Sequence, residues 1–223
     1  MKELDLRAIV QYPFPENQYY KEEHAKTQIF LHHTAGGADA KNVFYGWTAN
    51  GDKIATCVSV SGKSKTAVDG QIVQGFSSKY WAYHLGLKQD VFTKNGVKYK
   101  PLDRNSIGIE ICNWGYVTKT KRGWETYVGT LVPESEVVEY AQPFRGHSHY
   151  HRYTDAQIES VRQLLVYWSK TYGIPVTYKG VEIFDVDKRA LSGEAGVYTH
   201  CSVRYDKCDI HPQPEMIQML KSL

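Results

Sequence analysis

Two segments of the chain, far apart in sequence, carry residue types that bind metal ions. The first, residues 29–36 (IFLHHTAG), begins with three apolar residues, which predicts a buried strand that ends in two histidines. The second, residues 199–209, contains His200 and, further on, Cys208 and Asp209. A hydrolytic zinc site requires three protein ligands and one open position for water. One histidine of the first segment, His200, and a thiolate or carboxylate of the second would supply them.

The chain resembles the zinc-dependent N-acetylmuramoyl-L-alanine amidases of the type 2 amidase and peptidoglycan recognition protein superfamily, which includes the phage lysozyme-type amidases. The motifs that carry the resemblance follow the family's order over roughly residues 27–212: IFLHHTAG, AVDGQIVQ, WAYHLG, NSIGIEI, YTDAQ and THCSVRYDKCD. Each motif is weak alone, and the shared order makes the signal strong. The resemblance implies an α/β fold with a single mixed-sheet domain flanked by helices, a zinc cofactor, and hydrolysis of the amide between N-acetylmuramic acid and L-alanine.

The resemblance also implies which residues hold the zinc. The family pattern of three apolar residues followed by the ligand selects His32, and His33 then points to the opposite face of the strand and has a supporting role. His200 is the second ligand. Cys208 has the spacing of the cysteine-ligand branch, whereas Asp209 matches the Lys-x-Asp motif of the carboxylate branch. We favour Asp209 as the third ligand, with Cys208 as the alternative, since zinc accepts both.

Two further matches are implied to be catalytic. Glu110, in NSIGIEI, would take a proton from the attacking water and pass it to the leaving amine. Lys207 would stabilise the oxyanion of the tetrahedral intermediate. The ordinary alternatives are a glutamate on the solvent face of an edge strand and a surface lysine. Some phage members have a tyrosine before the Asp-Gly turn, which residues 55–58 (ATCV) lack, so proton transfer is assigned to Glu110.

Other histidines and aromatic residues have weaker assignments. Trp81, Tyr83 and His84 match the family's WAYHLG region and are expected to contact substrate; the alternative is an aromatic loop packed on the core. Residues 147–151 (HSHYH) would place three histidines on one face of an extended chain. Such histidine-rich loops more often bind nothing specific, so we assign no second metal there.

The hydrophobic pattern predicts the elements that would position these residues. The expected elements are strands at 28–33, 54–60, 107–111 and 176–183, a tight Asp69-Gly70 hairpin turn, and helices that begin after Asp39, after the Thr154/Gln157 capping box and at Pro214. Glu110 is expected on the face opposite the isoleucines of its strand. We expect one domain over residues 1–223, with an irregular N-terminal arm at 1–26 and an insertion over the core at 116–153.

Composition narrows the possible settings. With 223 residues, 42% hydrophobic content and a net charge of +3, we expect a globular monomer that binds peptidoglycan or muropeptides, with no nucleic-acid partner and no membrane span. The four cysteines have no disulfide-framework spacing, which fits a reducing compartment or scattered free thiols. The N-terminus lacks an apolar secretory segment, so we expect synthesis in the cytoplasm without a signal peptide.

These features favour a phage or prophage endolysin that acts on the bacterial cell wall. The alternatives are a cytosolic muropeptide-recycling amidase and a peptidoglycan-binding recognition module without catalysis. A closed structural zinc domain fits poorly, because such sites usually have four ligands.

Overall fold

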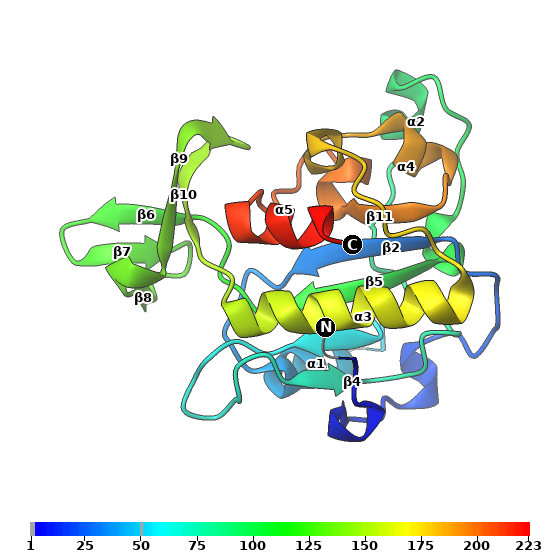
Figure 1. Ribbon diagram of the computed structural model, residues 1–223, viewed down its shortest axis with the longest axis horizontal. Helices are drawn as coiled ribbons and strands as arrows, with labels where there is room; N and C mark the ends of the chain where they lie inside the picture. Colours follow the sequence, from blue (N-terminus) through cyan, green and yellow to red (C-terminus); the bar gives the residue numbers. More distant parts are fainter. Residues whose placement is uncertain (1–2, 50) are drawn as a thin grey trace.

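A mixed sheet of six strands carries the core of the protein, in the spatial order β1-β4-β3-β5-β2-β11. The computed structural model describes residues 3–49 and 51–223. Only the β3–β4 pair is antiparallel; the other neighbours in the sheet run parallel. The strands are β1 (Val10–Gln11), β2 (Gln28–His33), β3 (Val58–Val60), β4 (Ile72–Gln74), β5 (Ser106–Ile111) and β11 (Gly196–Thr199) (Figure 1).

Two adjacent interior strands of the sheet, β2 and β5, are buried along their whole length. All six residues of β2 and all six of β5 are buried, as expected for parallel strands covered on both faces. Such strands are normally apolar throughout, yet β2 ends in two histidines and β5 contains Glu110. Polar groups in this position need partners, which points to a functional site at the carboxyl ends of the strands.

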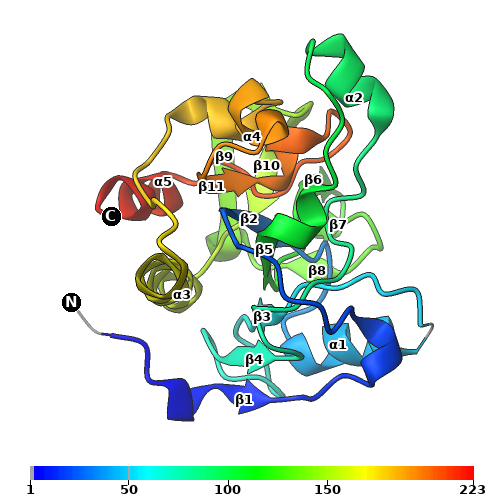
Figure 2. The ribbon, with the colours of Figure 1, turned by 90° about the vertical axis from the view of Figure 1, so that its right-hand side faces the viewer.

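Helices cover both faces of the sheet. The long helix α3 (Asp155–Tyr172) and the C-terminal helix α5 (Pro214–Lys221) lie on one face, and α1 (Ala40–Thr48) lies on the other (Figure 2). The predicted start of α3 is confirmed, because Thr154 and Gln157 form a capping box. The helix ends at Gly173, which has the left-handed conformation that glycine adopts most easily. The remaining helices are α2 (Gln89–Lys94) and α4 (Lys188–Ser192).

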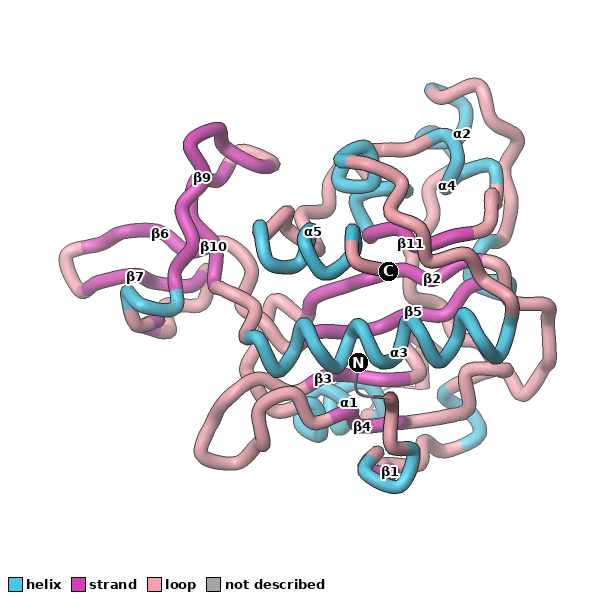
Figure 3. The backbone as a smooth tube through the Cα atoms, in the orientation of Figure 1, coloured by secondary structure: helices cyan, strands magenta, loops and turns pink. Residues whose placement is uncertain are grey.

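The segment between β5 and α3 forms two small sheets outside the main one. One sheet contains β6 (Val117–Thr120), β7 (Gly123–Thr126) and β8 (Leu131–Val132), and the other is the hairpin of β9 (Val137–Phe144) and β10 (His147–His151). Figures 1 and 3 place both beyond one end of the main sheet. Its strands pair with one another, and Phe144 and Tyr150 of the hairpin contact Phe184 and His211 of the core.

Three elements predicted from the sequence differ in the structure. Strand β3 is shorter than the predicted 54–60, and Ile54 makes only an isolated bridge to Tyr83. The Asp69-Gly70 turn lies just before β4, at the end of an eleven-residue connection from β3, so it does not close a tight hairpin. Residues 176–183 contain no strand; Gly180, with a φ of 96°, interrupts the run before a short 3-10 helix.

The N-terminal arm is mainly irregular, as predicted for the part of it that the structure describes. Its short strand β1 nevertheless joins the main sheet beside β4. Phe14 of the arm is buried in the core. Residues 1 and 2 lie outside the described residues. Within the described ranges, no helix combines the length and the apolar character needed to cross a lipid bilayer.

Candidate metal centre

Two adjacent parallel strands bring the histidines of the two sequence segments together. Strand β11 pairs with β2, so that Thr199 lies opposite Leu31. His32 is the next residue of β2, and His200 begins the 3-10 helix that follows β11. Parallel pairing thus places both side chains at the same edge of the sheet, and their ring centroids are 4.5 Å apart.

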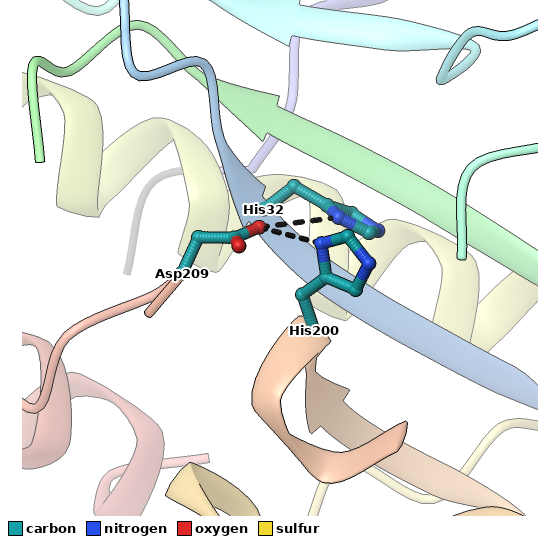
Figure 4. A group of neighbouring side chains, drawn as sticks. All are labelled: His32, His200 and Asp209. Carbon is teal, nitrogen blue, oxygen red and sulfur yellow. Dashed lines mark hydrogen bonds and ion pairs between the residues drawn. The ribbon is translucent and has the colours of Figure 1, made fainter. Parts of the chain in front are cut away.

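Asp209 completes a compact group with these histidines (Figure 4). Its Oδ2 atom is 2.9 Å from Nδ1 of His200 and 3.4 Å from Nδ1 of His32. All three residues are buried, and their candidate ligand atoms lie within 4.8 Å of one another. In tetrahedral coordination, two ligand atoms each ~2.0 Å from one zinc ion are roughly 3.3 Å apart. The two separations that involve Asp209 are therefore close to those between ligand atoms of a zinc site.

Electrostatics in the group favour the protonation states that a metal requires. Burial, reinforced by His200, lowers the pKa of His32 to about 4, so its imidazole is neutral at neutral pH. Although burial opposes ionisation of Asp209, its interactions with His200 and His32 hold its pKa well below the usual range. A neutral imidazole at His32 and an ionised carboxylate at Asp209 are the forms in which these residues bind zinc.

The alternative ligand Cys208 is not a member of this group among the residues that the structure describes. Its thiol is half-buried, and burial raises its pKa to about 11, so it is protonated at neutral pH. A protonated thiol outside the group is a poor ligand, because zinc binds the thiolate. The geometry thus favours Asp209 over Cys208.

Glu110 lies beside the group on the neighbouring strand. It pairs in register with His32, and its side chain is buried. Burial and the charge of Asp209 raise its pKa well above the usual range, while Lys207 acts in the opposite direction. Because β5 is a central strand, the alternative of a glutamate on a solvent-exposed edge strand is wrong.

A surface pocket of about 430 Å³ opens next to the group. His200 and Lys207 line it together with Tyr83, His84 and Tyr99. Lys207 is half-buried there and close enough to act on the pKa of both His32 and Glu110. The pocket thus reaches one residue of the ligand group, His200, and one residue predicted to be catalytic, Lys207.

His33 points away from this pocket, as strand alternation predicts. Its Nδ1 atom is 2.7 Å from the hydroxyl of Tyr153, and its ring lies near that of His211. Both partners belong to the side of the sheet covered by α3 and α5. His33 therefore supports the packing beneath the site.

The three residues predicted to contact substrate have different environments. Tyr83 is exposed and lines the pocket. Trp81 is buried, with Tyr20 stacked on its ring at 4.0 Å and the Arg104 guanidinium 5.1 Å from the ring centroid. Packing thus occupies the ring of Trp81, and its contact with substrate stays a prediction. His84 lines the pocket, but its Nδ1 atom is also 3.0 Å from Nε2 of His32.

The His147–His151 run forms strand β10 and gathers no metal ligands in the described part of the chain. His147 stacks on Tyr116, and its neighbours in the run form ion pairs with glutamates of the same small sheet region. Ring stacking and contacts with glutamates thus account for the positions of these histidines.

Sequence reasoning missed Asp103 and the carbonyl of Leu85. Oδ1 of Asp103 accepts hydrogen bonds from the backbone N–H groups of His84 and Leu85, at 2.8 and 3.0 Å. The Leu85 carbonyl oxygen is 3.0 Å from Nε2 of His200. A backbone carbonyl has no signature in sequence, and an aspartate ahead of a strand is indistinguishable from a turn residue.

A family model described as N-acetylmuramoyl-L-alanine amidase (Amidase_2) matches residues 23–214. That range covers most of the chain and includes every residue of the metal-ligand group. No curated protein sequence matches the chain at a significant level.

Several solved structures share the fold. PlyL superposes with a TM-score of 0.52 at 19% identity, with 96% of each chain covered. A mutant endolysin from Bacillus subtilis gives 0.52 at 17% identity, again over 96% of each chain, and the catalytic domain of XlyA gives 0.52 at 16%, over 95% of this chain and 98% of that one. At these identities the likeness concerns the fold, whereas the family match rests on the sequence. The chain belongs to the N-acetylmuramoyl-L-alanine amidase family.

Proposed function

We propose that the protein is a zinc-dependent amidase that hydrolyses the bond between N-acetylmuramic acid and L-alanine in peptidoglycan or muropeptides. One observation carries the proposal: the buried group of His32, His200 and Asp209 directs three ligand atoms to one place beside an open pocket. Membership of the amidase family supports the choice of bond.

The ligand group also fits a metal through its hydrogen bonds. The Leu85 carbonyl can only accept, so Nε2 of His200 carries the hydrogen in their 3.0 Å contact. In the neutral imidazole, Nδ1 then presents a lone pair to Oδ2 of Asp209, 2.9 Å away. Two acceptors at this distance repel each other unless a proton or a cation lies between them. A divalent ion satisfies both.

Zinc and Glu110 have different roles in the proposed hydrolysis. When bound, zinc supplies Lewis-acid activation of the scissile carbonyl and of the attacking water. The Glu110 carboxylate takes a proton from the attacking water and delivers it to the leaving nitrogen of L-alanine. Burial and the charge of Asp209 raise the pKa of Glu110, and a raised pKa makes its carboxylate a stronger base for the first of these steps.

Lys207 and Tyr83 act on the substrate from the pocket walls. The ammonium of Lys207 neutralises the negative charge that develops on the carbonyl oxygen. The exposed ring of Tyr83 provides an apolar surface for the substrate next to His200 and Lys207.

Mass spectrometry of digested peptidoglycan tests the proposal. We expect new L-alanine amino termini and no new reducing sugar ends, because Asp209 is assigned to the metal and is then not available to pair with Glu110 as the second carboxylate of a glycosidase. New reducing ends would identify a glycosidase instead. Binding to peptidoglycan at full zinc occupancy, without new termini of either kind, would move the protein to the recognition class.

The same digest distinguishes the biological settings. An endolysin, the setting we propose, cuts intact sacculi, whereas a recycling amidase prefers small muropeptides. The endolysin named among the structures with this fold motivates the choice. Comparing cleavage rates on sacculi and on purified monomeric muropeptides decides between the two.

A further inference from the structure

The ring of His84 is held between a metal-ligand histidine and the start of strand β5. Its Nδ1 atom lies 3.0 Å from Nε2 of His32, and its Nε2 atom lies 2.8 Å from the hydroxyl oxygen of Ser106. The Ser106 hydroxyl in turn donates to the backbone carbonyl of Asp103 at 3.4 Å. These contacts form one continuous chain of hydrogen bonds from a backbone carbonyl to His32.

The direction of this chain follows from its last acceptor. A carbonyl oxygen only accepts, so Ser106 uses its single hydrogen on Asp103 and must accept from Nε2–H of His84. Nδ1 of a neutral His84 is then a lone pair, which accepts from Nε2–H of His32. His32 is thereby left with a lone pair on Nδ1, the atom that faces Asp209.

Leu85, the residue after His84, fixes the tautomer of His200, the other proposed histidine ligand. The Leu85 carbonyl accepts from Nε2–H of His200, which leaves the lone pair of that ring on Nδ1. The His84-Leu85 segment thus contacts both histidines, one through a side chain and one through a carbonyl. In both histidines, His32 and His200, this tautomer leaves the lone pair on Nδ1, the atom that faces Asp209.

A single buried carboxylate holds this segment in place. Oδ1 of Asp103 accepts from the N–H groups of both His84 and Leu85. The side chain of Asp103 is almost fully buried. Gly108 leaves room for the ring of His84 because it has no side chain. A Cβ atom at this position would lie 3.0 Å from Nδ1 of His84 and 2.6 Å from Cγ2 of Thr56.

We propose that His84 and Asp103 are positioning residues that fix the orientation and tautomer of His32 and His200 for metal binding. The inference rests on the proposed zinc site and assigns His84 a role different from substrate contact. Outer hydrogen-bond partners of metal-ligating histidines are typically worth about 10- to 100-fold in metal affinity.

Zinc affinity of the purified full chain, measured by competition with a chelator, tests the proposal without reference to catalysis. We expect His84→Ala and Asp103→Ala to weaken zinc binding by about 10- to 100-fold, and Ser106→Ala to weaken it less. His84→Asn and Asp103→Asn each retain an acceptor oxygen near the original position, so each is expected to recover most of the affinity lost in the alanine variant.

His147→Ala is the matched control, because it removes a histidine that stacks on Tyr116 outside the site. It should leave zinc affinity unchanged. The visible absorption of the cobalt-substituted protein gives a second readout, and we expect it to change in His84→Ala because the orientation of a ligand changes.

Three outcomes are distinguishable. Wild-type zinc affinity in His84→Ala, together with a raised KM, would overturn the positioning role and restore His84 as a substrate contact. If Asp103→Ala fails to fold, the His84 and Ser106 variants still decide the question. A wild-type chain that binds no zinc would remove the proposed function and this inference with it.

Discussion

His32 and Glu110 are register partners on the adjacent parallel strands β2 and β5, so their side chains leave the same face of the sheet side by side. Both are buried, although each is a polar residue near the carboxyl end of an interior strand. The separation between His32, a proposed metal ligand, and Glu110, the proposed proton-transfer group, is thus set by strand pairing. A site built on paired strands is more rigid than one built on loops, which suits groups that must stay in fixed positions.

We predict that Glu110→Gln retains the fold and zinc binding but lowers the rate of peptidoglycan hydrolysis by about 100- to 10,000-fold. The amide keeps the size of the carboxylate and loses its ability to exchange a proton. Activity assays and zinc analysis of the same preparation check this. Glu139→Gln, on exposed strand β9, is the control and should behave like wild type. Near wild-type activity in Glu110→Gln would remove the assigned role.

For Lys207→Met we expect a loss of about 100- to 1,000-fold in kcat, comparable with removal of one oxyanion-hole donor. The methionine keeps most of the stem that lines the pocket and removes only the charge. Zinc content should stay at the wild-type level. Lys121→Met, on the exposed turn between β6 and β7, controls for the change in net charge. An effect on KM alone would mean that Lys207 binds substrate without stabilising the transition state.

The identity of the third ligand is tested with a pair of adjacent variants. Asp209→Ala removes the carboxylate that faces both histidines, and we expect it to abolish stoichiometric zinc binding. Cys208→Ser changes a thiol outside the ligand group and should leave zinc binding intact. Metal analysis after exhaustive dialysis measures both. The reverse result, zinc retained without Asp209 and lost without Cys208, would establish the cysteine as the ligand.

The sequence was sufficient for the fold class because its strongest patterns are local. Strand β5 and the capped helix α3 occur where the alternation of apolar residues and the capping box predict them. The family match confirms the resemblance carried by the ordered motifs. These motifs also identified the residues of the ligand group, because each candidate occurs at the end of a recognisable strand or in a short matched segment.

What the sequence could not supply are partners that only the tertiary structure brings together. Trp81 is covered by Tyr20, 61 positions earlier, and nothing in the local motif indicates that its ring is occupied. Asp103 accepts hydrogen bonds from two backbone N–H groups. Almost every residue has such a group, so the sequence does not indicate which ones Asp103 contacts. Residues 176–183 have β-rich composition, but Gly180 breaks the extended run.

The two neighbouring histidines of β2 should respond differently to loss of their partners. Tyr153→Phe removes a hydroxyl that is 2.7 Å from Nδ1 of His33 and that accepts from the backbone N–H of His211 at 3.3 Å. Leaving these buried groups unpaired should cost about 1–3 kcal/mol of unfolding free energy, measured by urea denaturation. Zinc affinity should not change, because His33 is not a member of the proposed ligand group. The exposed Tyr127→Phe is the control, and a loss of zinc binding without loss of stability would contradict this separation.

Lys26 provides a pH-dependent test of the core. Its ammonium is buried and donates to the carbonyls of Tyr80 and Arg104, at 3.0 and 2.8 Å. Burial lowers its pKa from the ordinary 10.5 to about 8. Between these two values the unfolded chain holds more protons than the folded one, so the contribution of Lys26 to the free energy of unfolding rises with pH; below about pH 8 it is constant.

Comparison with Lys26→Met isolates this contribution, because the tyrosines and other thiols titrate in both proteins. The neighbouring Cys57 thiol stays protonated over this range, since burial raises its pKa to about 12. We expect the stability of wild type relative to the variant to increase by about 2 kcal/mol between pH 7.5 and pH 10, measured by urea denaturation at each pH. A difference that does not change with pH would mean that the ammonium of Lys26 titrates alike in the folded and unfolded chains, and that burial does not act on it as described.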